Sequence, residues 1–409
     1  MISRFIAVLQ TIALAMIGLP AAAQGPLAPL VTDAKILLDG RLRFEFADQD
    51  GFPQDATALT GRARFGFETG SVAGFTGLVE GDLTRDLGVD DFNSTINGKS
   101  QFPVVADPDS ERLNRLQLRY AAPFKSIDAS ATIGRQRIKL DDDRFVGNVG
   151  FRQNEQTYDA VRLRLSPLEA VEIDYTYIWH INRIFGSDSP VGEADADTHL
   201  INASVELPWG KLAGYAYLMD LDGPLAGASN QTYGLRFTGE ESLAAGLKAL
   251  YTAEFANQTD YADTPEEFDL SYLSLRGGLG YKGLSVKGGL DLLEGDGSRG
   301  FTTPLATLHK FQGFADVFLA TPAAGLEDVV VEAEYKMPDL PLLGDLRLAV
   351  WYHDFSAENG PGDFGEEIDW GVFVTPWEGV TLSVEYADFH GSPLRSDLRR
   401  LWTTLSLSY

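Results

Sequence analysis

Cysteine is absent from this chain of 409 residues, which excludes disulfide bonds, and histidine is scarce, with five residues. The histidines show no metal-ligand spacing such as His-x-x-x-His, and no glycine-rich phosphate-binding loop occurs. After the first two dozen residues, no segment approaches the roughly 18 apolar residues that a membrane helix requires. These absences argue against an enzyme and against a helical membrane protein.

Positive charge is in deficit. The chain has 33 Lys and Arg residues against 59 Asp and Glu residues, which gives a net charge of −26. Because nucleic acids are bound mainly through cationic side chains on their phosphates, this balance argues against nucleic acid as a partner.

The N-terminus has the pattern of a secretory signal. Arg4 precedes an apolar stretch over residues 5–19, and three alanines at 21–23 provide a small-residue cleavage site. We expect residues 1–23 to be a signal peptide that is removed and residues 24–34 to be a periplasmic lead-in. The folded unit is then expected over residues 35–409.

The remainder of the chain alternates apolar and polar residues over short segments, as in 36–47 and 171–182. Period-two alternation places the two sets of side chains on opposite faces of a β-strand. Behind a secretory leader, this pattern predicts a transmembrane antiparallel β-barrel in the outer membrane of a Gram-negative bacterium, apolar outside and polar inside. A soluble β-sandwich would expose too many apolar stripes to remain in solution.

Short and long connections alternate along the chain, which is typical of barrels with tight periplasmic turns and long extracellular loops. The count closes at about 18 strands with both termini on the periplasmic rim. Segment Phe311–Leu319 resembles a strand, but counting it would make the number odd, so we assign it to a long external loop. Segments 139–156 and 295–327 are predicted to fold into the barrel, whereas 87–112 is predicted to lie outside.

The inward-facing set is rich in charge. We predict a basic, pore-lining wall and constriction from Arg41, Arg43, Arg62, Arg64, Arg115, Arg119, Arg135, Arg137, Arg144, Arg152, Arg162 and Arg164. Arg135 and Arg137 are out of phase with the apolar residues before them, so a bulge or an extramembrane position is an alternative there. An opposing acidic wall is predicted from Glu172, Asp174, Glu254, Asp291, Glu332, Glu334 and Asp369.

Two interpretations of the arginines are open. They form a track for anionic solutes with a field across the lumen, or they neutralise acids on neighbouring strands and stabilise a polar interior. Both can hold at once. His180 is expected to face the lumen, which is the wrong face for a barrel lipase.

Residues 134–154 carry an unusual pattern, GRQRIKLDDDRFVGNVGFRQN. The pattern resembles a segment of outer-membrane proteins of the alginate-export family, and residues 303–316 (TPLATLHKFQGFAD) resemble a long loop of that family. The resemblance implies a barrel of about 18 strands with an arginine-rich conduit for an anionic polysaccharide. It also implies that Arg135, Arg137, Arg144 and Arg152 lie at or near the narrowing. Tyr409 ends the chain where the family more often has Phe.

We therefore expect a porin-like channel for hydrophilic, anionic solutes such as uronate oligo- or polysaccharides. The alternatives are a general diffusion porin and a plugged barrel that acts through its surface loops. Expected partners are outer-membrane lipid, lipopolysaccharide, saccharide solutes and, through Tyr409, the outer-membrane assembly machinery. No resident cofactor is expected apart from Ca²⁺ in the acidic loops, for which solvated loop acids are the simpler explanation; the acids are Asp86, Asp90, Asp91, Asp107, Asp109, Glu111, Asp260, Asp263, Glu266 and Glu267.

Overall fold

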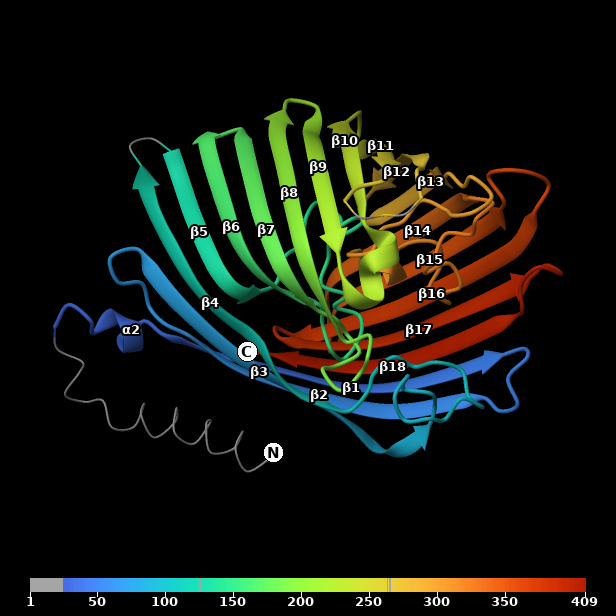
Figure 1. Cartoon of the computed structure of the whole chain (residues 1–409), viewed down its shortest axis with the longest axis horizontal. Coiled ribbons are helices and arrows are strands. Elements are labelled where there is room, and N and C mark those ends of the chain that lie inside the picture. The colour runs from blue at the N-terminus through green and yellow to red at the C-terminus, as the bar shows by residue number, and fades with distance from the viewer. Residues whose placement is uncertain (1–24, 125–126, 263, 265) are drawn as a thin grey trace.

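A computed structural model describes residues 25–124, 127–262, 264 and 266–409. The predicted signal peptide lies outside the described residues. Eighteen antiparallel strands form one sheet, and β1 pairs with both β2 and β18, which closes the sheet into a barrel (Figure 1). The fold class and the strand count predicted from the sequence are confirmed. No helix among the described residues is long and apolar enough to cross a membrane.

The strand bounds follow the alternating segments of the sequence. The strands are β1 (Lys35–Gln49), β2 (Ala56–Glu68), β3 (Phe75–Asp91), β4 (Ser110–Phe124), β5 (Ile127–Gln136), β6 (Thr157–Leu168), β7 (Val171–Asn182), β8 (Glu193–Leu207), β9 (Gly210–Leu221), β10 (Asn230–Ser242), β11 (Leu247–Thr259), β12 (Asp269–Tyr281), β13 (Leu284–Leu293), β14 (Leu326–Leu340), β15 (Gly344–Ser356), β16 (Asp363–Trp377), β17 (Val380–Gly391) and β18 (Leu398–Ser408). Within the described part of the chain, three short helical segments accompany them, which are α2 (Pro29–Thr32), η1 (Gly223–Ala228) and η2 (Leu308–Lys310).

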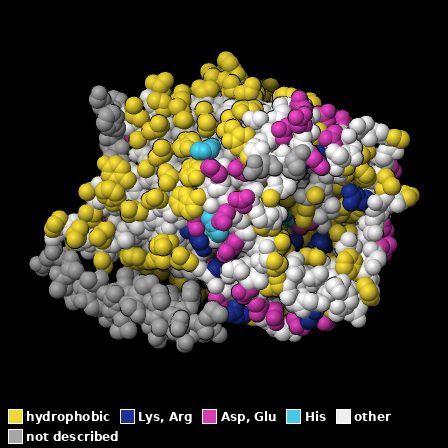
Figure 2. Space-filling model, in the orientation of Figure 1, with side chains coloured by type: hydrophobic (Ala, Val, Ile, Leu, Met, Phe, Trp, Pro, Cys, Tyr) yellow, Lys and Arg dark blue, Asp and Glu magenta, His cyan; other side chains and the backbone are white. Residues whose placement is uncertain are grey.

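Alternation along each strand separates an apolar outer face from a polar inner face. On β4, for example, Leu116 and Leu118 are exposed on the outer face. The neighbouring Arg115 points inward and bonds Glu80 of β3. Hydrophobic side chains cover the outer surface above β4 to β9 (Figure 2). An apolar outer surface of this extent is stable against lipid and not against water.

The start of β1 and the C-terminus meet at the rim that carries the short turns. The backbones of Leu38 and Tyr409 exchange two hydrogen bonds, which join the start of β1 to the last residue. Segment Phe311–Leu319 contains no strand and belongs to the connection between β13 and β14, as predicted.

Three long connections enter the barrel, and we name them loop A (92–109), loop B (137–156) and loop C (294–325). Loops B and C supply much of a hydrophobic core inside the wall, with Ile138, Phe145 and Phe301 buried against wall rings such as Tyr215. Loop A was predicted to lie outside, and that prediction is wrong. Its residues Phe92, Phe102 and Val105 pack on Ala47, Ala56 and Ala58 of β1 and β2.

Candidate functional site: the arginine wall and its loops

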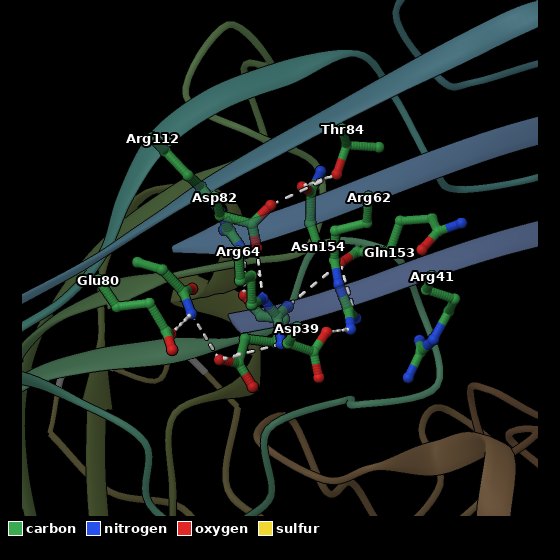
Figure 3. Close-up of polar contacts among 12 residues, drawn as sticks. Asp39, Arg41, Arg62, Arg64, Glu80, Asp82, Thr84, Arg112, Gln153 and Asn154 are labelled. Carbon is green, nitrogen blue, oxygen red and sulfur yellow. Dashed lines mark hydrogen bonds and ion pairs between the residues drawn. The ribbon is translucent and has the colours of Figure 1, made fainter. Parts of the chain in front are cut away.

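Four arginines form a row on the inner face of the first two strands. Strand alternation directs Arg41 and Arg43 of β1 and Arg62 and Arg64 of β2 inward, and the register places Arg41 directly opposite Arg62. Carboxylates separate some of these like charges, since Arg62 contacts Asp39 and Arg64 donates to Asp82 at 2.8 Å (Figure 3).

The backbone of loop B lies directly on this row. Arg41 donates to the carbonyl oxygens of Gly150, Phe151 and Arg152 at 3.0, 2.8 and 3.1 Å. Arg43 donates to the Phe151 carbonyl at 2.7 Å, and Arg64 donates to the Gln153 carbonyl at 3.2 Å. Loop B is therefore anchored by charge-assisted hydrogen bonds from the wall to its carbonyl groups.

Eight of the twelve predicted arginines pair with a carboxylate. The pairs are Arg62 with Asp39, Arg64 with Asp82 and Glu155, Arg115 with Glu80, Arg135 with Asp159, Arg137 with Glu155, Arg152 with Glu45, Asp107 and Asp316, Arg162 with Asp174, and Arg164 with Glu172 and Asp174. Among the described residues, no carboxylate pairs with the remaining four, which are Arg41, Arg43, Arg119 and Arg144. Neutralisation thus accounts for most of the arginines, and these four form no direct ion pair with a described carboxylate.

Arg135 does not line the lumen. It pairs in register with Asp159 of β6, next to Tyr158, which is fully buried on the inner side. Its guanidinium bonds the Asp159 carboxylate at 2.7 and 3.0 Å on the outer side of the wall. The phase shift seen in the sequence is real, and the resemblance misplaces this residue at the narrowing.

His180 also faces outward, contrary to our prediction. In the pairing of β7 with β6, the register shifts between Asp159 and Ala160, which leaves Trp179 as an extra residue in β7. Beyond that bulge, Ile181 is fully buried and His180 contacts the exposed Asp195 at 2.7 Å.

Arg152 joins all three loops to the wall. Its guanidinium is 3.1 Å from Glu45 of β1, 3.1 Å from Asp316 of loop C and 3.9 Å from Asp107 of loop A. Burial alone would lower the pKa of Arg152, but these three carboxylates outweigh burial and raise it. Arg152 is therefore a buried tie between loops, and it also lines the cavity that these loops enclose.

Loop B carries a second buried charge. Glu155 bonds Arg137 and accepts a hydrogen bond from Asn114 at 2.6 Å. Burial would raise the pKa of Glu155, but Arg64 and Arg137 hold it well below its usual range. The carboxylate stays ionised and fixes the end of loop B beside β2 and β4.

Loops B and C are docked to each other by rings and backbone. Phe151 stacks on His309 with centroids 3.5 Å apart, and His309 lies 5.1 Å from Phe314. The Gly147 amide donates to the Leu305 carbonyl at 2.8 Å. His309 also bonds the Asp316 carboxylate at 2.9 Å. Burial alone would raise the pKa of Asp316. The charges of His309, Arg152 and Arg400 outweigh burial and lower this pKa to about 2.

Arg144 lies at the far end of this junction. It is 1% exposed, donates to Gln312 at 2.6 Å and stands over the rings of Tyr272 and Phe311 at 5.0 and 4.8 Å. Cation–π contacts replace an acidic partner here.

The acidic residues are distributed over two places. Glu172 and Asp174 lie on β7 beside the β6 arginines, so they do not oppose the basic wall, and that part of the prediction is wrong. The other members lie on β11 to β16, where Glu254 contacts Arg236, Asp291 contacts Arg276, Glu332 contacts Lys287, Glu334 contacts Arg347, and Asp369 accepts the Phe314 amide at 3.1 Å.

Two cavities lie on either side of loop C. One, of 490 Å³, is bounded by loops A, B and C and by Arg183 and Phe185, which belong to the connection between β7 and β8. The other, of 460 Å³, is bounded by residues 310–314 and by strand residues near the short turns, such as Glu240 and Leu250.

Sequence reasoning missed Glu45 and Arg400, which form a buried pair at 2.9 Å beside Arg152. Strand parity offered a signal, because Glu45 has the same parity as Arg41 and Arg43. Arg400 likewise has the parity of Leu398 and Trp402, which are both buried.

Several acids of the predicted loop clusters have partners within the protein. Asp90 binds Lys99, Asp107 accepts the Gln153 amide, and Glu111 pairs with Arg85. Asp263 lies outside the described residues, and the part of the chain that the structure describes has no group of three or more His, Cys, Asp or Glu side chains arranged for a metal ion.

Comparison with known proteins returns no matching family model and no matching curated protein. Solved structures do match. Pseudomonas aeruginosa OccK9 (OpdG) superposes with a TM-score of 0.69 at 15% identity over 93% of this chain and 100% of that one. Acinetobacter baumannii OccAB3 gives 0.69 at 14% identity over 92% and 100%. The Pseudomonas aeruginosa outer membrane protein OpdK gives 0.68 at 15% identity over 92% and 98%, and OpdK has also been solved with vanillate. These likenesses show the fold.

Proposed function

We propose that this protein is a porin-like channel in the outer membrane of a Gram-negative bacterium and that it passes hydrophilic, anionic solutes. The observation that carries the proposal is the set of inward guanidinium groups without carboxylate partners among the described residues. Arg41 and Arg43 stand together in this set, at the place where loop B crosses the wall. A cation without a paired acid attracts anions into a narrow, low-dielectric passage.

The size of the path favours small solutes. Cavities of 490 and 460 Å³ match single small ligands or short oligosaccharides more closely than a polymer. Oligo-uronates fit both this size and the resemblance to the alginate-export family. OpdK, which shares the fold, was solved with vanillate, a small carboxylate, and this supports an anionic solute for the present barrel.

The membrane partners follow from the outer face. The exposed ring of Trp370, which stacks on that of Tyr386, suits a headgroup boundary, and the apolar belt suits lipid. We infer contact with outer-membrane lipid and lipopolysaccharide, and recognition of Tyr409 by the assembly machinery. The likeness to OpdK, an outer membrane protein, supports this location.

The test is the reversal potential of the refolded protein in a planar bilayer under a salt gradient. In the double variant Arg41→Gln plus Arg43→Gln, the glutamines keep donors for loop B but lose the charge. We expect the anion-over-cation permeability ratio to fall by about threefold. Arg135→Gln is the matched control, because its guanidinium lies outside the wall, and it should leave the ratio unchanged. An unaltered ratio in the double variant contradicts the proposal and favours a general diffusion porin.

A plugged barrel is the second candidate function. The observation that favours it is the buried core that loops B and C build inside the wall. Absence of any current from correctly folded protein would support a barrel that acts through its surface loops.

A further inference from the structure

Aromatic residues from loop C and from the strands line the 460 Å³ cavity, in a lumen whose wall is mostly polar. Phe311 and Phe314 come from loop C, and Trp351 comes from the inner face of β15. Trp351 points inward because its neighbours Val350 and Tyr352 are exposed on the outer face. It belongs to neither hydrophobic core cluster, so core packing does not explain an indole at this position.

Hydrogen bonding fixes the orientation of this ring. The Trp351 indole N–H donates to Glu332 at 3.2 Å, and Glu332 pairs with Lys287 at 2.5 Å. The Phe314 ring lies 4.8 Å from that of Trp351 at 49°. The two rings therefore form a preorganised apolar corner beside charged and hydroxyl-bearing side chains.

The polar groups around the corner are both donors and acceptors. Lys310, whose ammonium contacts Asp143 at 3.0 Å, is half exposed, and Thr238, Glu240 and Glu332 also line the cavity. The cations here already have acidic partners, so charge alone does not define the ligand of this site.

We propose that this cavity is a saccharide subsite in which a pyranose ring lies against Trp351 and Phe314. The C–H face of a sugar is apolar and packs on aromatic rings, whereas its hydroxyl groups both donate and accept hydrogen bonds. Glu332 accepts sugar hydroxyls, and Lys310 receives a hydroxyl or the carboxylate of a uronic acid. This inference rests on the proposed channel function and names the solute class of one part of the path.

The test is block of the single-channel current by a neutral trisaccharide, maltotriose, and by a trisaccharide of uronic acid. In Trp351→Leu, which removes the ring, the half-blocking concentration of both sugars should rise about tenfold. Trp351→Phe keeps an aromatic face and should retain most of the affinity. Trp370→Leu is the matched control, because Trp370 lies on the outer face of the neighbouring strand β16.

Equal block in the wild type and in Trp351→Leu overturns the subsite. Anion-selective current that neither sugar blocks also overturns it and leaves the proposed function intact. If the protein carries no current, the proposed function fails, and calorimetric titration of the same sugars in detergent decides the subsite: binding that is lost in Trp351→Leu supports it, and absence of binding overturns it.

Discussion

The wall of β1 and β2 and the wall of β16 hold their loops through opposite backbone groups. On the first wall, arginines donate to carbonyl oxygens of loop B. On the second, Glu367 and Asp369, which are 1% and 0% exposed, accept the amides of Ala315 and Phe314 in loop C. Loop B thus directs carbonyl oxygens toward the positively charged wall, and loop C directs amide N–H groups toward the acidic wall.

This difference shows how a barrel with strong internal charge can hold part of each loop through backbone groups, in addition to side-chain pairs such as Arg152 with Glu45. Backbone carbonyl and amide groups are available in any loop, so the sign of the wall charge selects which face of the loop is bound. The charges that remain without a partner then become available to a solute. We expect perturbations of the shared junction to have the largest effects and perturbations of paired charges to have the smallest.

The largest effect is expected for Arg152→Ala, which removes the tie among the three loops and leaves Glu45, Asp107 and Asp316 buried near one another. Breaking a buried charge network in this way costs about 3–5 kcal/mol of docking free energy. The wall should remain folded, because its strands are hydrogen-bonded around the whole ring. We expect a higher conductance and faster proteolysis within loops B and C, with unchanged heat-modifiable migration on gels.

Arg152→Lys serves as the control for that experiment, because it keeps the charge but not the forked geometry, and it should give an intermediate result. Conductance equal to that of the wild type in Arg152→Ala contradicts the role of Arg152 as a tie.

A smaller effect is expected from acid. The pKa of Asp316 is about 2 in the folded protein, below the value of about 3.9 for a free aspartate. A depressed pKa means that the stabilisation is complete above about pH 4 and is lost as the pH falls through about 2. The conductance of the wild type should therefore stay constant between about pH 8 and pH 4, where Asp316 remains ionised. It should change on further acidification, when Asp316 is protonated.

Asp316→Asn should show the altered conductance already at pH 7. Asp296 of the same loop provides a matched control, because its carboxylate accepts only local hydrogen bonds from Ser298 and Arg299. Asp296→Asn should behave as the wild type at pH 7, and a wild-type conductance in Asp316→Asn would show that the carboxylate does not hold the junction.

The same comparison explains what the sequence could predict. Alternation determines which face of a strand a residue occupies, so strand number and the inward direction of Arg41, Arg43, Arg62 and Arg64 were predictable. A bulge reverses the alternation beyond it, and the bulge at Trp179 in β7 turns His180 outward. The partners of Arg152 are 107 residues away at Glu45 and 164 residues away at Asp316. No local pattern encodes such pairings, because they depend on how the loops enter the barrel.

The burial of loop A was also missed by the sequence analysis. Its apolar residues Phe92, Phe102 and Val105 are spaced irregularly in a polar segment, so periodicity gave no signal for burial. Their number in one loop was a signal, since a loop exposed to water has little reason to carry three large apolar side chains.

The smallest effect is expected where cation and acid already neutralise each other. Arg162 bonds Asp174 at 2.5 Å on neighbouring strands of the lumen wall. The double variant Arg162→Gln plus Asp174→Asn removes one charge of each sign, so the net charge of the lumen is unchanged. We expect the reversal potential to stay at the wild-type value, measured beside the Arg41→Gln plus Arg43→Gln variant under the same salt gradient. If both double variants lower anion preference equally, selectivity depends on the number of arginines and not on the absence of an acidic partner, and the distinction between paired and unpaired arginines has no functional meaning.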